Sequence, residues 1–377
     1  MNYSKADFTL GILGGGQLGK MLLQVTSRLS IKTNILDPSD DSPCKEICSK
    51  FTKGPLMDFD TVYNFGKECD LVTYEIEHVN VDALEKLESE GIKVYPDSKT
   101  LKIIQDKSTQ KKFFIKNGIP TANYKHYKSL KDLDTIKYPC VWKKTKFGYD
   151  GYGVKILKSK DDIKNLPETE FIIEDLIPFK KELATTIARN KSGQIEIFPI
   201  VEMMFNEISN QVEYVLCPAQ ISSEINEKAK KLALKVSESF KQVGLLAVEM
   251  FLTNDNEILI NEVAPRPHNS AHYSIENCIN SQFDQHINSI LDLPLGSSKS
   301  NFYAIMINLV GGLGYEGQVV YEGIKEAMLI DNVKLHIYGK HKTKPNRKMG
   351  HATVLGSNLE NVLKKAKKIK ELVKVKT

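Results

Sequence analysis

TLGILGGGQLG, residues 9–19, predicts a buried strand that ends in a glycine turn and leads into a helix. The helix is indicated because Leu18, Met21, Leu22 and Val25 follow at helical spacing. The next hundred residues repeat this alternation, with expected strands at 33–36, 71–74 and 92–94 and an expected helix at 81–88. Alternating strands and helices predict a parallel α/β sheet up to a boundary near residue 105.

The glycine turn fits the spacing GxGxxG, and Asp37 lies at the end of the next expected strand. Glycines let backbone amides approach an anion at a helix N-terminus, where the partial charge is positive. This pattern is compatible with a phosphate-bearing substrate, with a dinucleotide, or with a purely structural tight turn. The first of these is the interpretation that we favour.

Length and composition narrow the class of protein. A chain of 377 residues predicts two or three domains, and 41% apolar with 26% charged residues is typical of a globular protein. The formal charge of +5 does not require a nucleic-acid partner, and the lysine-rich run at 364–370 is expected to be a solvated helix face. We also expect reduced cysteines, no membrane segment and a cytoplasmic location.

A helix is expected at 107–117. Beyond it, a second glycine loop, GYDGYG at 148–153, connects an expected strand at 138–143 with a returning strand at 154–157. Lys143, Lys144 and Lys146 precede it. Flexible backbone donors beside ammonium groups suit a polyphosphate, although an exposed hairpin tip with surface lysines remains an alternative.

Two glutamates provide the strongest local signal. Expected strands at 246–252 and 257–263 form a hairpin, which would set Glu249 opposite Glu262 on one face. Two such charges ~4 Å apart would repel by ~4 kcal/mol at an effective dielectric constant of ~20. A divalent cation between them, with Asn261 as a neutral oxygen ligand, would relieve the repulsion; in a different register each glutamate would pair with Arg266 or a lysine.

The loop that follows, APRPHNSAH at 264–272, is too polar for a core and too specific for a linker. Arg266 can hold a phosphate or carboxylate with two hydrogen bonds, and His268 can donate to an anion or transfer a proton. Such groups beside a pair of carboxylates suited to a metal indicate catalysis more than structure.

Taken in order, GILGGGQLG, TYEIEHV, GYDGYG, VEMF, INEVAPRPHNSAH, YGK and RKMGH resemble the 5-(carboxyamino)imidazole ribonucleotide synthases of the ATP-grasp superfamily. The resemblance covers nearly the whole chain. It implies an N-terminal Rossmann-like domain at 1–105, a small lid domain at 106–172 and a C-terminal mixed α/β ATP-grasp domain at 173–377, with a terminal subdomain from about 300. It also implies a homodimer that carboxylates aminoimidazole ribonucleotide with ATP and bicarbonate, through carboxyphosphate, in purine biosynthesis.

The resemblance also implies roles for individual residues. Magnesium, or manganese in its place, would be held by Glu249 and Glu262. ATP would be contacted by Lys107, Lys143, Gly148, Gly151, Gly153, Glu174, Leu176, Glu182, Asn261 and Glu262. The catalytic residues would be Tyr149, Asp150, Arg266, His268 and Asn269. The ribonucleotide would be bound by Gly16, Gln17, Leu18, Glu75, Lys340 and Arg347, with the last two on its phosphate.

The glycine loop departs from the family pattern. Tyr152 stands where the family has a basic residue, Val154 where it has glutamine, and Phe147 where it has glycine. Outside this loop, Ala271 replaces the glycine that precedes His272. Either Lys155 or Lys146 supplies the missing basic group, or the site is weakened by its loss. The alternatives are another ATP-grasp amine ligase such as a formate-dependent transformylase, an NAD-dependent dehydrogenase, and a non-catalytic nucleotide-binding protein.

Overall fold

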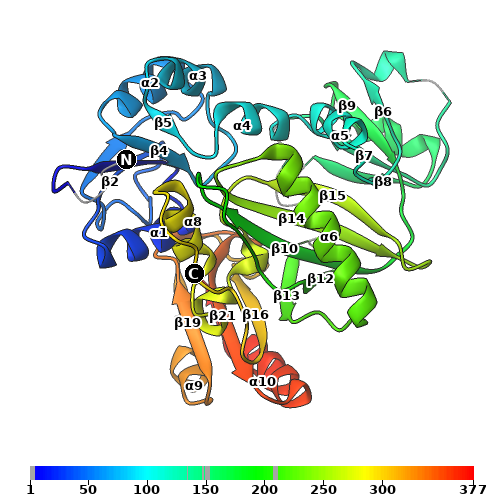
Figure 1. Ribbon diagram of the computed structural model, residues 1–377. Helices are drawn as coiled ribbons and strands as arrows, with labels where there is room; N and C mark the ends of the chain where they lie inside the picture. Colours follow the sequence, from blue (N-terminus) through cyan, green and yellow to red (C-terminus); the bar gives the residue numbers. More distant parts are fainter. Residues whose placement is uncertain (1–4, 134, 147, 149–152, 207–210) are drawn as a thin grey trace.

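The computed structural model describes residues 5–133, 135–146, 148, 153–206 and 211–377. Three main sheets organise these residues, and Figure 1 shows a parallel N-terminal sheet, a small sheet at the far side of the molecule and a large antiparallel sheet between and below them. The predicted parallel α/β sheet in the N-terminal part is confirmed.

The N-terminal sheet is parallel, with strand order β3-β2-β1-β4-β5 among the described residues. Its strands are β1 (Thr9–Leu13), β2 (Lys32–Asp37), β3 (Lys50–Lys53), β4 (Leu71–Tyr74) and β5 (Lys93–Val94). Its helices are α1 (Gln17–Arg28), α2 (Phe59–Lys67), α3 (Val81–Ser89) and α4 (Ser98–Ile104). Asp58, Asn80 and Asp97 begin the last three helices by accepting a backbone N–H, which explains where these helices start.

The small sheet is antiparallel with order β6-β9-β7-β8 and follows helix α5. Its elements are α5 (Lys107–Lys116), β6 (Tyr124–Tyr127), the short helix η1 (Leu130–Asp132), β7 (Cys140–Lys144), β8 (Val154–Leu157), η2 (Lys160–Asn165) and β9 (Phe171–Asp175). Trp142 and Phe171 form its buried centre, with ring centroids 6.0 Å apart. Strand β9 runs past residue 172, where the sequence suggested a boundary.

The large sheet continues from the middle of the chain into its C-terminal part, with order β15-β14-β10-β12-β13-β16-β21-β19 and β11 paired to β10. The antiparallel pair β13 and β16 makes this connection. The strands are β10 (Phe179–Arg189), β11 (Ile195–Ile197), β12 (Val201–Phe205), β13 (Val212–Cys217), β14 (Gly244–Thr253), β15 (Ile258–Ala264), β16 (Tyr303–Val310), β19 (Val333–Ile337) and β21 (Lys348–Gly356).

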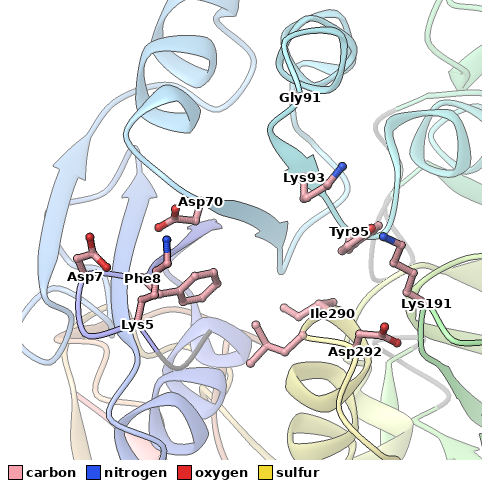
Figure 2. Close-up of a pocket in the computed structure, with 11 residues that line it drawn as sticks. Lys5, Asp7, Phe8, Asp70, Gly91, Lys93, Tyr95, Lys191, Ile290 and Asp292 are labelled. Carbon is pink, nitrogen blue, oxygen red and sulfur yellow. The ribbon is translucent and has the colours of Figure 1, made fainter. Parts of the chain in front are cut away.

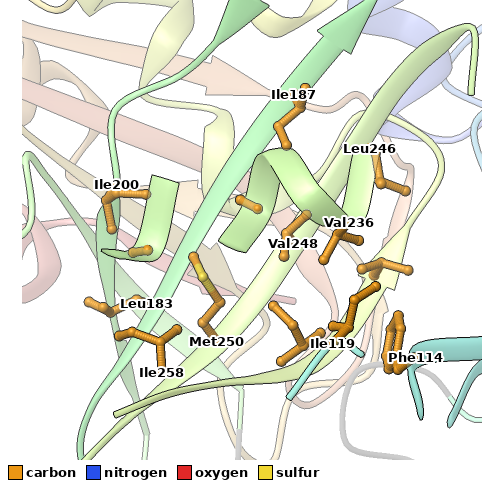
Figure 3. Packing of buried hydrophobic residues seen from close by; sticks show 14 of the residues in the cluster. Phe114, Ile119, Leu183, Ile187, Ile200, Val236, Leu246, Val248, Met250 and Ile258 are labelled. Carbon is orange, nitrogen blue, oxygen red and sulfur yellow. The ribbon is translucent and has the colours of Figure 1, made fainter. Parts of the chain in front are cut away.

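Helix α6 (Ser223–Phe240) covers one face of this sheet and closes its core. Val236 of the helix belongs to the same buried cluster as Leu183 of β10, Val248 of β14 and Ile258 of β15, as Figure 3 shows. Fully burying an aliphatic side chain of this kind stabilises the fold by about 1.5–3 kcal/mol. The core therefore fixes the strands whose opposite face carries the polar site.

The remaining elements surround the C-terminal strands. They are η3 (Asn269–Ala271), α7 (Ser274–Asn277), α8 (Gln282–Ile290), β17 (Gly317–Gln318), β18 (Val320–Glu322), α9 (Ile324–Met328), β20 (Lys342–Thr343), α10 (Leu359–Leu372) and β22 (Lys374–Lys376). In α10, Val362, Ala366 and Ile369 are buried, which confirms the lysine-rich run as one face of an amphipathic helix. The six cysteines are free thiols. No helix in the described part of the chain has the length and apolar character needed to cross a bilayer.

Candidate active site

A β-bulge at Asn261 sets the geometry of the two central carboxylates. Ile260 pairs with Met250, but one step further along the hairpin Glu262 pairs with Glu249, so Asn261 is an extra residue on β15. A regular ladder would have set Asn261 opposite Glu249. The predicted opposition of Glu249 and Glu262 is confirmed, and the bulge is what produces it.

Two lysines surround this pair of glutamates. Lys107, at the start of α5, forms an ion pair with Glu262, and Lys143 of β7 donates to the Asn261 amide oxygen at 3.0 Å. The Asn261 side chain lies 3.5 Å from Glu249 through its amide nitrogen. Burial and the neighbouring Glu262 raise the pKa of Glu249, whereas Lys107 holds the pKa of Glu262 low. Glu262 is therefore the ionised carboxylate of the site, and Glu249 is the carboxyl group that lacks a full counter-charge.

Lys143 also belongs to a buried ionic group centred on Glu174 of β9. One oxygen of Glu174 lies 2.9 Å from Lys143 and the other lies 3.0 Å from Lys111 of α5. The lysines lower the pKa of Glu174 against the opposing effect of burial. The resemblance implies an adenine contact for Glu174 and Leu176, which stays a prediction. The Glu174 carboxylate contacts Lys143, and Leu176 lies just beyond the end of β9.

Glu182 occupies the strand next to the hairpin. It lies on β10 opposite Phe251 of β14, and burial raises its pKa to about 7. Its charge is one of the influences that raise the pKa of Glu249, so the two carboxylates are near one another. Three acidic groups from three strands thus face a region supplied with lysines from α5 and β7.

The loop after β15 carries the expected acceptor residues. His268 Nε2 lies 3.4 Å from the Glu249 carboxylate, and burial with the nearby Arg266 lowers the pKa of His268 to about 4. Arg266 forms an ion pair with Glu77 at 2.8 Å through Nε. His268 is consequently neutral at physiological pH and adjacent to the proposed metal ligands.

Two amide side chains hold this loop in place. Asn269 and Asn308 of β16 exchange hydrogen bonds of 2.9 and 2.8 Å through their amide groups. Gln282, fully buried at the start of α8, accepts from His268 N at 2.8 Å and donates to His268 O at 2.9 Å. These contacts fix the backbone of the loop before any ligand binds.

The first glycine turn is filled by carboxylates of the protein itself. Gly15 N donates to Asp37 at 2.7 Å, and Gly16 N donates to Glu75 at 2.8 Å. A phosphate at these amides would meet both carboxylates, which disfavours the dinucleotide interpretation of the turn. Burial raises the pKa of Glu75 to about 7 although the Gly16 amide and Arg266 act in the opposite direction.

The two cations expected on the ribonucleotide phosphate come from the C-terminal part of the chain. Lys340 is close enough to Glu75 to affect its pKa, and its ammonium donates to Lys348 O at 2.8 Å. Arg347 lies 3.7 Å from Asp41 of the N-terminal part. Gln17 and Leu18 begin α1 directly after the glycine turn. The C-terminal cations therefore face the carboxyl ends of the parallel strands, where the glycine turn lies.

The second glycine loop is only partly described. Tyr149, Asp150 and Gly151, together with Tyr152 and Phe147, lie outside the described residues. Gly153 has a φ of +80°, and its carbonyl accepts from Lys144 N at 2.8 Å, which closes the hairpin. Gly148 is described, but its neighbours on both sides are not. Lys155 donates to Asn165 O at 3.0 Å, while Lys146 lies 4.0 Å from Asp106, the residue before Lys107. Of the two substitutes for the missing basic group, Lys146 is the one near the site.

Sequence reasoning missed several residues that shape the site: Glu77, Lys111, Thr121, Gln282 and Asn308. Their partners are distant in the chain, so no local pattern identified them. The bulge did leave a signal, because the buried residues Ile258, Ile260 and Val263 change from a spacing of two to a spacing of three at Asn261.

A separate cavity of about 330 Å³ lies at the amino-terminal ends of the parallel strands, opposite to the ends that carry the glycine turn. Phe8, Asp70 and Lys93 lie at the starts of three of these strands. Tyr95, Lys191 and Asp292 complete its wall (Figure 2). None of the described residues that line it is an expected site residue. The cavity is thus distinct from the polar site described above.

Comparison with known protein families agrees with this geometry. A ribonucleotide synthetase preATP-grasp domain matches residues 8–105, an ATP-grasp domain matches residues 112–283, and a phosphoribosylaminoimidazole carboxylase C-terminal domain matches residues 304–365. The N5-carboxyaminoimidazole ribonucleotide synthase of Bacillus subtilis is 36% identical, and the match covers 92% of this chain and 91% of that protein. The chain spans about 65% of the longer Vigna aconitifolia relative named phosphoribosylaminoimidazole carboxylase.

Solved structures give the same result. The N5-carboxyaminoimidazole ribonucleotide synthetase of Thermotoga maritima is 41% identical, with a TM-score of 0.90 and coverage of 98% of this chain and 99% of that one. The Aspergillus clavatus N5-carboxyaminoimidazole synthase, in complex with ADP and 5-aminoimidazole ribonucleotide, is 34% identical, with a TM-score of 0.88 and coverage of 97% and 99%. A ligase of this kind leaves the dehydrogenase alternative without support. The chain belongs to the N5-carboxyaminoimidazole ribonucleotide synthase family of ATP-grasp ligases.

Proposed function

We propose that this protein uses ATP and bicarbonate to carboxylate the exocyclic amine of 5-aminoimidazole ribonucleotide, releasing ADP and phosphate, in purine biosynthesis. The observation that carries the proposal is the opposed pair Glu249 and Glu262, surrounded by Lys107 and Lys143 on one side and His268 on the other. Lysines suited to phosphate contact Glu262 and Asn261, and the loop proposed to border the acceptor contacts Glu249, which supports the proposal. The Aspergillus clavatus structure is a complex with ADP and 5-aminoimidazole ribonucleotide, which supports ATP and this ribonucleotide as substrates here.

Magnesium fits the donors at this pair. Hard divalent cations prefer oxygen ligands, and Glu249, Glu262 and Asn261 supply carboxylate and amide oxygens. Within the described residues, no group of three or more His, Cys, Asp or Glu side chains is arranged as a metal site, so nucleotide phosphate oxygens would complete the coordination. The bound ion would neutralise charge on the transferring phosphoryl group, and manganese could substitute for it.

The protein's own groups perform the rest of the ATP half-reaction. Lys107 and Lys143 meet the phosphates, and Glu174 holds Lys143 in position for this contact. Glu182, whose pKa is raised to about 7, accepts a hydrogen bond from a hydroxyl group of the ribose, and Leu176 borders the adenine. Gly148, Gly151 and Gly153 provide the backbone of a lid that closes over the phosphates, which excludes water from a labile carboxyphosphate.

The acceptor half-reaction uses the loop after β15. Arg266 and Asn269, with Tyr149 and Asp150, border bicarbonate and the ribonucleotide. His268 is neutral near pH 7, so it can take the proton that the amine loses when its nitrogen attacks the carboxyl carbon. Gly16, Gln17, Leu18 and Glu75 hold the aminoimidazole ribose, and Lys340 and Arg347 bind its phosphate.

The domain division 1–105, 106–172 and 173–377 belongs to the same proposal, with a terminal subdomain from about 300. The homodimer and the cytoplasmic location are likewise proposed from the family resemblance. The small sheet formed by β6 to β9 would be the moving lid.

ADP release tests the proposed reaction. The purified protein is assayed with ATP, magnesium and bicarbonate, with and without the ribonucleotide. We expect turnover to rise strongly on adding the ribonucleotide. Turnover that responds to formate and not to bicarbonate would indicate the transformylase alternative, and no stimulated turnover at all would indicate a non-catalytic nucleotide-binding protein.

A further inference from the structure

The bulge at Asn261 lies on an edge strand. Strand β15 ends the large sheet, so among the residues that the structure describes no strand pairs along most of its outer edge. A one-residue slip in an edge strand moves each later side chain to the opposite face. Such a slip would separate Glu262 from Glu249, so something must hold β15 in its bulged register.

The segment that follows α5 contacts β15 at the residue before the bulge. Ile260 N donates to Pro120 O at 2.8 Å, and Thr121 Oγ1 donates to Ile260 O at 2.7 Å. Thr121 and Ile260 also form an isolated parallel bridge. Both backbone groups of Ile260 are therefore bound from outside the sheet, immediately before the chain departs from the regular ladder.

The Thr121 hydroxyl is itself oriented by a buried cation. Lys111 donates to Thr121 Oγ1 at 2.5 Å, so the hydroxyl proton is directed to the Ile260 carbonyl. The same ammonium lies 3.0 Å from Glu174, whose second oxygen holds Lys143. Lys143 then reaches the bulged residue itself by donating to Asn261 Oδ1. The bulge is thus held from both sides by one continuous set of polar contacts.

We propose that Thr121 and Lys111 are positioning residues that hold the Asn261 bulge of β15 and thereby keep Glu262 opposite Glu249. Neither side chain is assigned a contact with ATP, bicarbonate or ribonucleotide. They act on the metal site through the backbone of Ile260. This inference rests on the proposed role of the two glutamates as metal ligands.

Binding of Mn²⁺ in the presence of ADP, measured from the free-ion electron paramagnetic resonance signal, tests the inference without turnover. Thr121→Val keeps the shape of the side chain but leaves the Ile260 carbonyl without its side-chain donor and removes one of the two acceptors of the Lys111 ammonium, which keeps Glu174. Losing such a buried hydrogen bond typically corresponds to about tenfold in an equilibrium constant. We expect Thr121→Val to weaken Mn²⁺ binding by about that factor and Thr121→Ser to restore it.

Thr353→Val is the matched control, because Thr353 is a buried strand threonine whose hydroxyl has no hydrogen-bond partner among the described residues. Its Mn²⁺ affinity should equal that of the wild type. Lys111→Met breaks the same set of contacts and provides the measurement if Thr121→Val does not fold. ADP affinity without the metal should stay within about twofold for Thr121→Val and Thr121→Ser, a difference of only a few tenths of a kcal/mol.

The inference is overturned if Thr121→Val and Lys111→Met bind Mn²⁺ as the wild type does while Glu262→Gln has lost binding. In that outcome the proposed metal site stands and only the positioning role falls. Wild-type affinity in Glu262→Gln as well would remove the metal site and this inference together.

Discussion

Glu249 and Glu262 lie opposite each other on β14 and β15 because Asn261 is an extra residue in the ladder. The bulge sets two carboxylates on one face of a sheet whose other face is packed against α6. Burial and Glu262 raise the pKa of Glu249, whereas Lys107 keeps Glu262 ionised. A pair held in this way gains most from a cation that contacts both members, and this relationship underlies the proposed chemistry.

Glu262→Gln should reduce turnover by roughly two to three orders of magnitude, as expected for losing a group that stabilises charge in the transition state. The melting temperature should fall only modestly, because the change removes the ion pair with Lys107 but also relieves the unfavourable effect of Glu262 on the Glu249 carboxyl group. Glu257→Gln on the same hairpin is the control, since its carboxylate is exposed. An unchanged rate in Glu262→Gln would remove this residue from the metal site.

Lys340→Met should raise the KM for the ribonucleotide by about ten- to a hundredfold, which corresponds to losing one charge-assisted hydrogen bond. The KM for ATP should not change, because Lys340 acts on Glu75 and donates to the Lys348 carbonyl, and neither is a proposed ATP contact. Lys334→Met, at an exposed position of β19, serves as the control. Equal effects on both KM values would place Lys340 outside the phosphate site.

Lys146→Met and Lys155→Met distinguish the two candidates for the basic group that Tyr152 replaces. Lys146 lies 4.0 Å from Asp106, beside Lys107, whereas the Lys155 ammonium is bound to the Asn165 carbonyl. We expect a loss of about tenfold in kcat/KM for ATP in Lys146→Met, comparable to one exposed phosphate contact. Lys155→Met should retain its rate. The reverse pattern would contradict the assignment.

Tyr152→Lys restores the basic residue of the family pattern. If Lys146 has taken over its role, the rate of this variant should stay within about twofold of the wild type, a difference of a few tenths of a kcal/mol. Steady-state turnover under saturating substrates measures it. A large gain would show that the departure in the loop is not compensated.

His286 of α8 predicts how stability depends on pH. Its Nε2 lies 2.8 Å from Thr73 Oγ1 of β4, and burial lowers its pKa to about 3. The unfolded chain takes up the proton near pH 6.5, so the stabilising contribution is complete above that pH and is lost as the pH falls. At pH 5 the loss is about 2 kcal/mol, from ~1.4 kcal/mol per pH unit.

Calorimetric melting temperatures at pH 7.5 and pH 5.0 test this expectation. His286→Gln keeps a side chain that can hydrogen-bond to Thr73 but does not titrate. The melting temperature of the wild type should fall further between pH 7.5 and pH 5.0 than that of the variant. Identical losses would show that His286 does not account for any of the pH dependence.

The parallel sheet and the glutamate hairpin could be predicted from sequence because both leave local patterns. The strand 9–13 and the strand 71–74 match β1 and β4 at both ends; Gly14 ends the first apolar run, and Asp70 and Glu75 flank the second. The contacts that orient the site could not be predicted in this way. Lys111 and Glu174, or Asn269 and Asn308, are far apart in the chain, and only the folded sheet brings them together.

The glycine turn shows the limit of a motif most clearly. GGGQLG has the spacing of a phosphate-binding loop, but Gly15 and Gly16 donate to Asp37 and Glu75. Spacing alone could not reveal that two carboxylates from neighbouring strand ends would occupy these amides. The cations for a phosphate come instead from positions 340 and 347, more than three hundred residues along the chain.

The fate of a bicarbonate oxygen tests the central claim most directly. The protein is given ATP, magnesium, the ribonucleotide and bicarbonate labelled with ¹⁸O, and the released phosphate is analysed by mass spectrometry. Phosphorylation of bicarbonate followed by transfer of the carboxyl group leaves one bicarbonate oxygen on the phosphate, so the account predicts labelled phosphate whose release depends on the ribonucleotide. Turnover that yields only unlabelled phosphate would contradict the carboxyphosphate route.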